Sequence, residues 1–263
     1  MSKPKTPVRQ IRSIVNDSGD YSYTNRVMIG TAVTGLVRVE WVAARFSQLI
    51  PVNWSNVQAN EYMSGYYPLR YQVADAQNLI VKQFLINDFE WLFFLEHDVL
   101  LPDNALMMLD EYMRDAKYPV MSGLYYTRAH PPAPLVFRGR GTGAYTDWKL
   151  GDKVWCDGVP TGCLLIHQSI LKAMWAESPE YNLKGQTTRR VFHTPRRVVV
   201  DPETGRHNAT SGTSDLDWCD KVMKGGFFEK AGWKDFAPDM AYPFLVDTNL
   251  FCKHINMDGA QFP

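Results

Sequence analysis

The sequence predicts an α/β fold in which helices cover a central sheet, and three observations support this prediction. Residues 91–95 form a run of five apolar residues, short and bulky enough for a strand that is buried on both faces. Apolar residues at helical spacing occur on both sides of this run. Apolar runs at 26–35 and 119–126 complete a strand–helix–strand–helix–strand order, which is typical of a right-handed parallel α/β layer.

Composition limits the classes of protein to consider. The 263 residues suffice for one large α/β domain or two small ones, and 45% hydrophobic residues support a substantial core. Lys+Arg and Asp+Glu both total 28, so no overall charge favours nucleic acid or a membrane. The four cysteines lack C-x-x-C spacing and the density of a small secreted framework, which predicts reduced thiols.

The N-terminal residues 1–24 are polar and rich in turn formers, so we expect a flexible arm there. The sequence has neither the apolar core of a signal peptide nor a run of about 18 apolar residues that could span a bilayer. It therefore predicts a cytoplasmic protein with no membrane partner.

The first predicted strand, in residues 26–35, runs into a loop that contains Thr31 and Thr34. An amphipathic helix is expected over residues 39–50, followed by a turn or short strand at 51–54. The apolar residues of this helix are expected to face the core: Val39, Val42, Ala43, Phe46, Leu49 and Ile50.

A second helix is expected over residues 72–87, before the strand at 91–95. Its apolar stripe consists of Val73, Ala76, Ile80 and Phe84. A third helix is expected to begin near Pro102, because proline suits the first turn of a helix, and to lead into the strand at 119–126.

After Arg128 the pattern changes to loops and short antiparallel strands. Residues 161–166 predict a buried strand with a short helix behind it, and 215–224 predict a helix before a last apolar strand in 242–254. Residues 178–213 are long and mostly polar, which predicts a hairpin on a mobile loop. This loop contains Arg189, Arg190, Arg196, Arg197 and Arg206.

Acidic residues follow the strand at 91–95 directly, as Glu96-His97-Asp98. In open α/β sheets, ligands bind beyond the carboxyl ends of such strands. Two carboxylates two residues apart can hold a hard divalent cation there, and the cation can hold a diphosphate. If the motif stood alone, an acidic turn after a core strand would be the favoured explanation.

The order of other polar residues along the chain supports a functional interpretation of this motif. Asp75 and Asn78 lie on the helix before it, and Asp215 and His254 follow it. Together with Pro160-Thr-Gly and Glu96-x-Asp98, this order resembles the GT-A fold glycosyltransferases over about residues 26–258. In that family a D-x-D motif ends the nucleotide-binding half, and the acceptor half carries a G-T-G-type strand, an "E-D" helix and a late histidine.

The chain departs from the family pattern at three places. The D-x-D motif appears as Glu96-x-Asp98, the "E-D" pair appears as Ser214-Asp215, and the arginine that commonly precedes the nucleotide-side asparagine is absent. The resemblance implies one GT-A domain over residues 25–263, with a Rossmann-like nucleotide-sugar half at 25–127, a mixed sheet, and an acceptor half at 128–263.

The resemblance also implies an activity: metal-dependent transfer of a sugar, with inversion, from a nucleoside-diphosphate sugar to an acceptor hydroxyl. A UDP-sugar is favoured as the donor, and Mn²⁺ or Mg²⁺ as the cofactor. Asp98 and His254 are the implied metal ligands, Glu96 a metal ligand or donor contact, and Asp215 the catalytic base. The implied donor contacts are Thr31, Thr34, Asp75, Asn78 and His97.

Some of these residues have simpler explanations. The helix dipole favours acids in a first helical turn, and Ser214-x-x-Asp217 is close to a capping box, so capping accounts for Asp217. Asn78 could bond only to the backbone, and His254 could be a partly buried core histidine.

The acceptor and the function class remain open at this stage. The arginine-rich stretch 186–207, with Arg128, Arg138 and Arg140, could bind the phosphates of the donor or of DNA, or could form a solvated hairpin. The chain also resembles small phage-encoded glycosyltransferases that act in the host cytoplasm, some on hydroxymethylated pyrimidines in DNA. An extruded base could then be received by Tyr145, Trp148 or Trp155.

A saccharide or another small molecule is the other acceptor class. A nucleotidyltransferase acting on a sugar phosphate would share the α/β half, but the loop at residues 31–35 lacks the basic residue usual there. A non-catalytic nucleotide-sugar-binding protein would also keep the fold. The sequence identifies neither the sugar nor the nucleobase of the donor.

Overall fold

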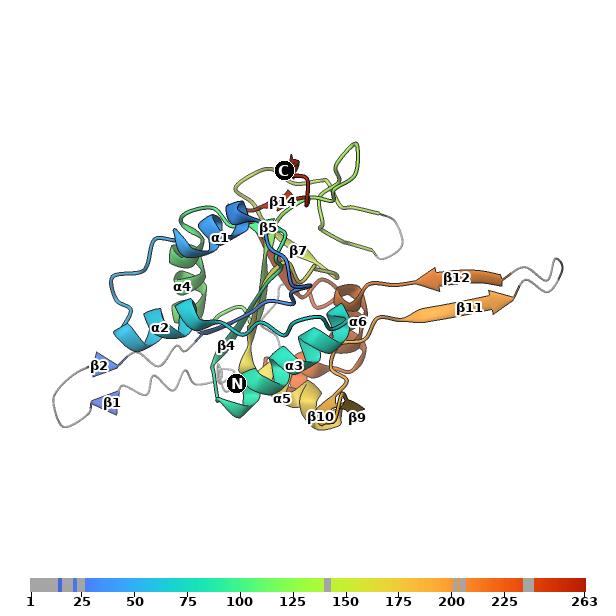
Figure 1. Ribbon diagram of the computed structural model, residues 1–263, viewed down its shortest axis with the longest axis horizontal. Helices are drawn as coiled ribbons and strands as arrows, with labels where there is room; N and C mark the ends of the chain where they lie inside the picture. The colour runs from blue at the N-terminus through green and yellow to red at the C-terminus, as the bar shows by residue number, and fades with distance from the viewer. Residues whose placement is uncertain are drawn as a thin grey trace, which may run out of the picture.

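A central sheet separates two helical layers in the computed structural model of the protein (Figure 1). The structure describes residues 14–15, 21–22, 27–139, 143–200, 203, 207–233 and 239–263. Most of the expected N-terminal arm lies outside these residues. Within it, β1 (Ile14–Val15) and β2 (Tyr21–Ser22) form an antiparallel pair.

The central sheet has six strands and mixed directions. In spatial order they are β3 (Val27–Gly30), β4 (Trp91–Leu95), β8 (Cys163–His167), β6 (Val120–Leu124), β13 (Phe244–Phe251) and β7 (Lys153–Cys156). β3 is parallel to β4 and β6 is parallel to β13, whereas β8 and β7 run antiparallel to their neighbours. The mixed sheet is confirmed, but β4 and β6 are not neighbours, because β8 from the later half of the chain pairs between them.

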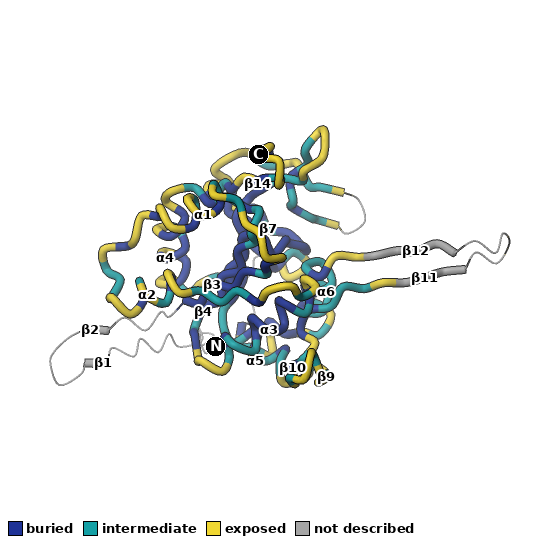
Figure 2. The backbone as a smooth tube through the Cα atoms, in the orientation of Figure 1, coloured by how far each residue is buried: buried dark blue, intermediate teal, exposed yellow. Residues whose placement is uncertain are grey.

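Helices cover both faces of this sheet (Figure 1). One layer contains α3 (Val73–Ile86), α5 (Gln168–Glu177), α6 (Ser214–Lys224) and α7 (Phe227–Lys230). The other contains α1 (Val39–Phe46), α2 (Asn56–Ser64) and α4 (Ala105–Asp115). Figure 2 shows that the buried residues concentrate in the central strands between the layers. β4 is buried along its whole length, as its sequence predicts.

Smaller sheets surround this body. One has the order β15-β14-β5 and contains β5 (Val99–Leu100), β14 (Lys253–Ile255) and β15 (Gln261–Phe262). Two hairpins are formed by β9 (Glu180–Leu183) with β10 (Gln186–Arg189), and by β11 (Arg196–Val200) with β12 (His207–Ser211). The segment 178–213 therefore contains two hairpins where the sequence predicts one, and β11 and β12 extend away from the body (Figure 1). Its mobility stays a prediction.

The helix predicted over residues 39–50 is wrong in length and in the face that it buries. α1 ends at Phe46, and the residues expected to face the core are exposed, with Val39 at 74%. The buried residues are Trp41 and Arg45. The indole N–H of Trp41 donates to the Glu96 carbonyl (2.8 Å), and Arg45 and Tyr62 of α2 donate to each other's backbone carbonyls. These hydrogen bonds, and not the apolar stripe, decide which face of α1 is buried.

The other elements differ less from expectation. Pro102 lies before α4, whose N-cap is Asn104, and Val73 at the start of α3 is exposed. The sequence analysis did not predict α2 or β7. The four cysteines are buried free thiols, as expected.

Within the described ranges, no helix is long and apolar enough to cross a membrane.

The contact between β3 and α3 supports the first testable prediction. A Cβ atom at Gly30 would lie 2.3 Å from Cγ2 of Ile80, so α3 can approach the sheet only because Gly30 has no side chain. Gly30→Ala should lower the free energy of unfolding by about 1–3 kcal/mol, because an added methyl group overpacks this contact. Urea denaturation measures the loss.

Ile80→Ala supplies the matched control. It removes the atoms that the new methyl group would meet, so the double variant should lose clearly less stability than the sum of the single variants. Additive losses would contradict the proposed contact.

Candidate active site

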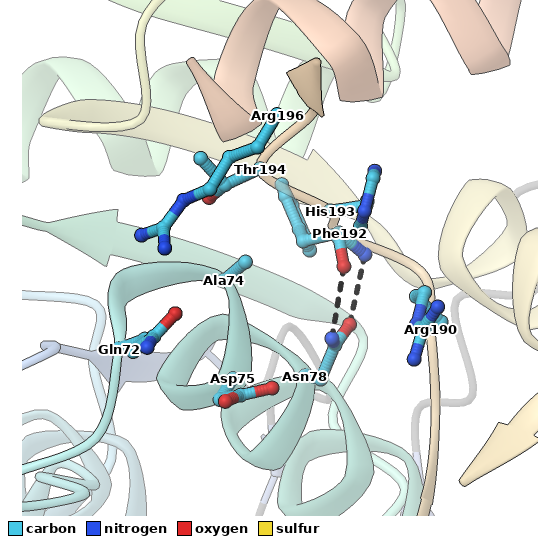
Figure 3. A pocket seen from close by; sticks show the side chains of 9 residues that line it. All are labelled: Gln72, Ala74, Asp75, Asn78, Arg190, Phe192, His193, Thr194 and Arg196. Atoms are coloured by element: carbon cyan, nitrogen blue, oxygen red, sulfur yellow. Dashed lines mark hydrogen bonds between the residues drawn. The ribbon is translucent and has the colours of Figure 1, made fainter. Parts of the chain in front are cut away.

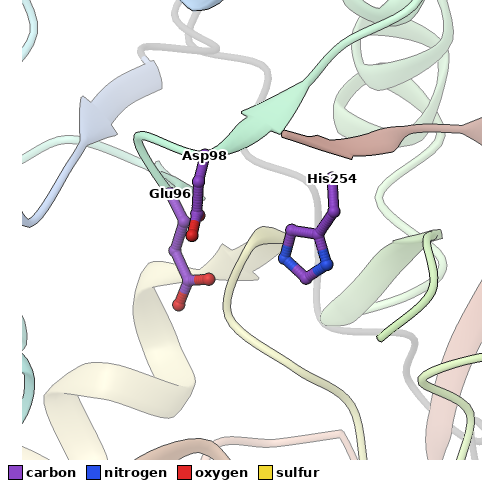
Figure 4. Close-up of side chains that lie close together, drawn as sticks. All are labelled: Glu96, Asp98 and His254. Carbon is purple, nitrogen blue, oxygen red and sulfur yellow. The ribbon is translucent and has the colours of Figure 1, made fainter. Parts of the chain in front are cut away.

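The side chains of Glu96, Asp98 and His254 converge beyond the carboxyl end of β4 (Figure 4). One potential ligand atom from each residue lies within 4.8 Å of the other two. The pairing of β5 with β14 places His254 opposite Val99, and the Ile255 N–H donates to the Asp98 carbonyl (2.8 Å). Backbone pairing therefore holds β14 beside the acidic turn.

The imidazole of His254 is oriented by its neighbours. Nδ1 bonds to the Tyr126 carbonyl, which can only accept, so the proton must be on Nδ1 and Nε2 carries the lone pair. The Tyr125 ring contacts the imidazole edge-on at 4.8 Å between centroids. Burial lowers the pKa of His254, although the nearby Asp98 opposes this effect. A neutral, oriented imidazole is the form that binds metal ions.

Glu96 ends a chain of hydrogen bonds that begins on α3. Gln77 Nε2 donates to the Thr161 hydroxyl (3.1 Å), which donates to Glu96 Oε1 (3.0 Å). Burial, then the charges of Asp98 and Asp215, raise the pKa of Glu96 to about 8. Without a cation, this raised pKa favours the protonated carboxyl group at neutral pH.

Asp98 has a cationic partner in this structure. Arg128 Nη1 donates to Asp98 Oδ2 at 2.8 Å, and the Arg128 side chain is 45% exposed while the Asp98 side chain is 18% exposed. An exposed ion pair of this kind contributes little stability. A divalent cation could therefore replace Arg128 at a small free-energy cost.

Asp215 lies in the first turn of α6. Its Oδ1 accepts the Leu216 N–H (2.8 Å), and burial raises its pKa even though hydrogen bonds to the carboxylate, first from the Thr213 side chain, oppose the shift. The capping explanation of Asp217 is wrong: the N-cap residue is Thr213, its side chain makes no capping hydrogen bond, and Asp217 pairs with Lys221 at 2.8 Å.

Tyr125 is a buried residue of the site that the sequence analysis missed. Its hydroxyl accepts the Gly162 N–H (2.7 Å), and the Gly162 carbonyl accepts the Glu96 N–H (3.0 Å). A Cβ at Gly162 would lie 2.2 Å from the Tyr125 oxygen, so this position requires glycine. Burial raises the pKa of Tyr125, and the charges of Glu96 and Asp215 raise it further.

A cavity of about 270 Å³ lies between the start of α3 and the 190–196 segment (Figure 3). The Asn78 amide donates to the Phe192 carbonyl (2.9 Å) and accepts the Phe192 N–H (2.8 Å). Asn78 therefore holds the backbone of the cavity wall, and these bonds do not support its predicted contact with the donor. The carboxylate of Asp75 lines the cavity and accepts the Tyr181 hydroxyl (2.8 Å).

The remaining predicted donor contacts lie apart from this cavity. Thr31 is fully buried, and its hydroxyl has no partner in the described part of the chain, so the structure does not support direct contact with a donor. Thr34 is exposed on the following loop. His97 is partly exposed and does not belong to the cluster formed by its two neighbours.

The arginine-rich surface is described only in part. Arg189 is held by Glu180 (2.8 Å) and by the carbonyls of Trp175 and Ala176, which is the behaviour of a locally paired hairpin. Arg196 lines the Asp75 cavity. Arg140, Arg206 and the side chain of Arg197 lie outside the described residues.

The pKa of Glu96 leads to a pH prediction. The folded state keeps the Glu96 proton up to about pH 8, whereas an unfolded chain releases it near pH 4.5. Between these values Glu96 lowers stability as the pH rises, by up to about 1.4 kcal/mol per pH unit. Glu96→Gln should therefore gain stability over the wild type progressively from pH 4.5 to 8, measured by urea denaturation in EDTA.

The exposed Glu111→Gln serves as the control and should show no such trend. If the difference in the free energy of unfolding between Glu96→Gln and wild type does not change over this pH range, Glu96 is ionised in the folded protein.

No protein-family model matches this chain, and no curated protein matches it. Among solved structures, A197 from STIV is similar over 90% of this chain and 93% of that chain, with 14% identity and a TM-score of 0.51. TarS from S. aureus matches over 59% of this chain and 30% of its own, with 10% identity and a TM-score of 0.38. A glycosyltransferase involved in glycosylation of the major capsid of PBCV-1 matches over 57% and 66%, with 12% identity and a TM-score of 0.32.

The last two scores are too low to carry an argument. The similarity to A197 extends over nearly the whole of both chains and establishes the fold. Together with the strand order of the sheet, it confirms the predicted α/β fold with a mixed sheet.

Proposed function

We propose that this protein is a metal-dependent glycosyltransferase that moves a sugar from a nucleoside-diphosphate sugar to an acceptor hydroxyl. The observation that carries the proposal is the convergence of Glu96, Asp98 and His254 beyond β4, with the Asp215 carboxylate near enough to raise the pKa of Glu96. This arrangement lies at the edge of the sheet where α/β proteins bind their ligands.

The residues fit a divalent cation. Two carboxylates and a neutral imidazole offer ligand atoms within 4.8 Å of one another, and the Tyr126 carbonyl fixes the tautomer that leaves Nε2 available. Mn²⁺ accepts carboxylate and imidazole ligands, whereas Mg²⁺ prefers oxygen ligands and retained water, so we favour Mn²⁺. When bound, the cation would neutralise charge on the diphosphate leaving group.

The protein's own side chains have distinct tasks in this proposal. Asp98 would hold the cation in place of Arg128, and Glu96 would release its proton to become a ligand. Arg128 is then free to face the negatively charged diphosphate. Thr34 and the Asp75 cavity are the proposed contacts for the rest of the donor, for which a UDP-sugar is favoured.

Asp215 is the proposed base. It takes the proton from the acceptor hydroxyl as that oxygen attacks the anomeric carbon, and the bond between that carbon and the diphosphate oxygen breaks, leaving its electron pair on the diphosphate. A raised pKa makes this carboxylate a stronger base than an exposed aspartate. Attack from the face opposite the leaving group inverts the anomeric carbon.

Two substitutions separate binding from transfer. Asp98→Ala should weaken Mn²⁺-dependent binding of UDP by about tenfold or more, measured by calorimetry, because a charged ligand is lost.

Asp215→Asn should keep this binding and lower sugar transfer by about 10²–10⁴-fold, because the base is lost. Release of UDP from a panel of UDP-sugars measures the transfer.

Asp217→Asn is the matched control, because Asp217 lies in the same helical turn but pairs with Lys221. It should retain both binding and transfer. Normal behaviour of both Asp98→Ala and Asp215→Asn would refute the site assignment, and release of pyrophosphate from a nucleoside triphosphate would identify a nucleotidyltransferase.

A further inference from the structure

A second cavity, of about 370 Å³, lies beside the edge strand β7 and outside the candidate active site. Three aromatic side chains, Tyr145, Trp148 and Trp155, contribute to its walls. The other lining residues are Arg138, Asp147, Asp152, Lys153, Val154 and Asp239. All three aromatic residues are partly exposed, so apolar ring surface remains open to a ligand.

Hydrogen bonds fix two of these aromatic side chains, Tyr145 and Trp148, in place. The Trp148 indole N–H donates to the Tyr145 carbonyl (2.8 Å), and the Tyr145 hydroxyl accepts from Arg138 (3.2 Å). The guanidinium group of Arg138 lies over the rings of Tyr145 and Tyr242, at 5.1 and 4.2 Å from their centroids. A ligand that binds here meets rings that are already ordered, which lowers the entropic cost of binding.

Three carboxylates provide hydrogen-bond acceptors around these rings. Asp152 uses Oδ2 for the Lys149 N–H (2.8 Å), and Asp239 uses Oδ1 for the Ala241 N–H (2.9 Å). Each of these local bonds engages one carboxylate oxygen. Asp147 is exposed, and none of the described residues forms a hydrogen bond with its side chain. Ligand hydroxyl groups are suitable donors to these oxygens.

Backbone contacts connect this cavity to the segment that enters the active site. Phe137, next to Arg138, accepts the Asp157 N–H (3.0 Å) and donates to the Gly158 carbonyl (3.3 Å). Leu216, next to the proposed base, packs so closely on Gly158 that a Cβ there would lie 2.8 Å from it. The cavity thus belongs to the half of the protein that carries Asp215.

We propose that this cavity binds a neutral carbohydrate unit of the acceptor, an inference that rests on the proposed glycosyltransferase function. The faces of sugar rings carry C–H groups that pack on aromatic rings, and their hydroxyl groups donate to carboxylates, so both parts of the wall are used. A few polar groups around an apolar floor are typical of small-ligand sites.

The charged side chains that line this cavity disfavour a nucleic acid as its ligand. Bases also stack on aromatic side chains, but their phosphates need a positively charged groove. Here three carboxylates accompany two cationic side chains, and Arg138 already contacts two rings. The aromatic residues considered for an extruded base thus lie together in a setting better suited to a sugar.

The test measures binding without donor or metal. Neutral oligosaccharides (maltohexaose, cellohexaose, chitohexaose and mannohexaose) and an oligothymidylate are titrated into the full-length protein, with tryptophan fluorescence and saturation-transfer NMR as readouts. At least one oligosaccharide should bind. Trp148→Ala should weaken that binding by about tenfold, and Asp147→Asn by about threefold.

Asp147→Asn changes an exposed side chain and should leave folding intact, which circular dichroism verifies. Asp103→Asn, an exposed aspartate outside the cavity, is the matched control and should bind as the wild type does. Absence of binding by every oligosaccharide, or equal binding by wild type and both cavity variants, overturns the proposal. Binding of only the oligothymidylate, lost in Trp148→Ala, overturns it in favour of nucleic acid.

A parallel titration with UDP and Mn²⁺ separates the two proposals. Intact UDP binding without oligosaccharide binding refutes the carbohydrate subsite alone. Oligosaccharide binding without Mn²⁺-dependent UDP binding refutes the proposed active site and leaves a carbohydrate-binding protein.

Discussion

Mutual repulsion among three carboxylates at the end of a buried strand is the constraint on which the rest of the site depends. Glu96 and Asp98 follow β4, whose five residues are all buried, and Asp215 lies near enough to raise the pKa of Glu96 further. Such a cluster is costly unless protons or cations neutralise it. Here the raised pKa of Glu96 favours its protonated form, and the guanidinium group of Arg128 pairs with Asp98. A divalent cation could take over both roles.

The arrangement of the sheet brings the remaining groups to this cluster. Because β8 pairs between β4 and β6, the segment before β8 places Thr161 and Gly162 against Glu96. Tyr125, just after β6, receives the Gly162 N–H and contacts His254. The antiparallel insertion of β8 therefore accounts for the two hydrogen bonds that hold Glu96, one to its side chain from Thr161 and one from its N–H to Gly162.

The sequence predicted the parts of this site that depend on local pattern. A bulky apolar run defines β4, the acidic residues follow it directly, and α3 and α6 show helical periodicity. The burial pattern of α1 could not be predicted in this way, because Trp41 is held by a carbonyl 55 residues away. Gln77 and Tyr125 were missed for the same reason, since their partners lie 84 and 37 residues away. Gln77 did have one signal, its place directly before Asn78, where the family commonly has arginine.

The most direct test of the account is a crystal structure with Mn²⁺ and UDP, with anomalous diffraction recorded at the manganese absorption edge. The account predicts one strong anomalous peak coordinated by Asp98, His254 Nε2 and the diphosphate, with Glu96 bound directly or through water, and Arg128 displaced from Asp98. UDP bound with no manganese between these side chains, or manganese bound elsewhere with the Asp98–Arg128 pair intact, would contradict it.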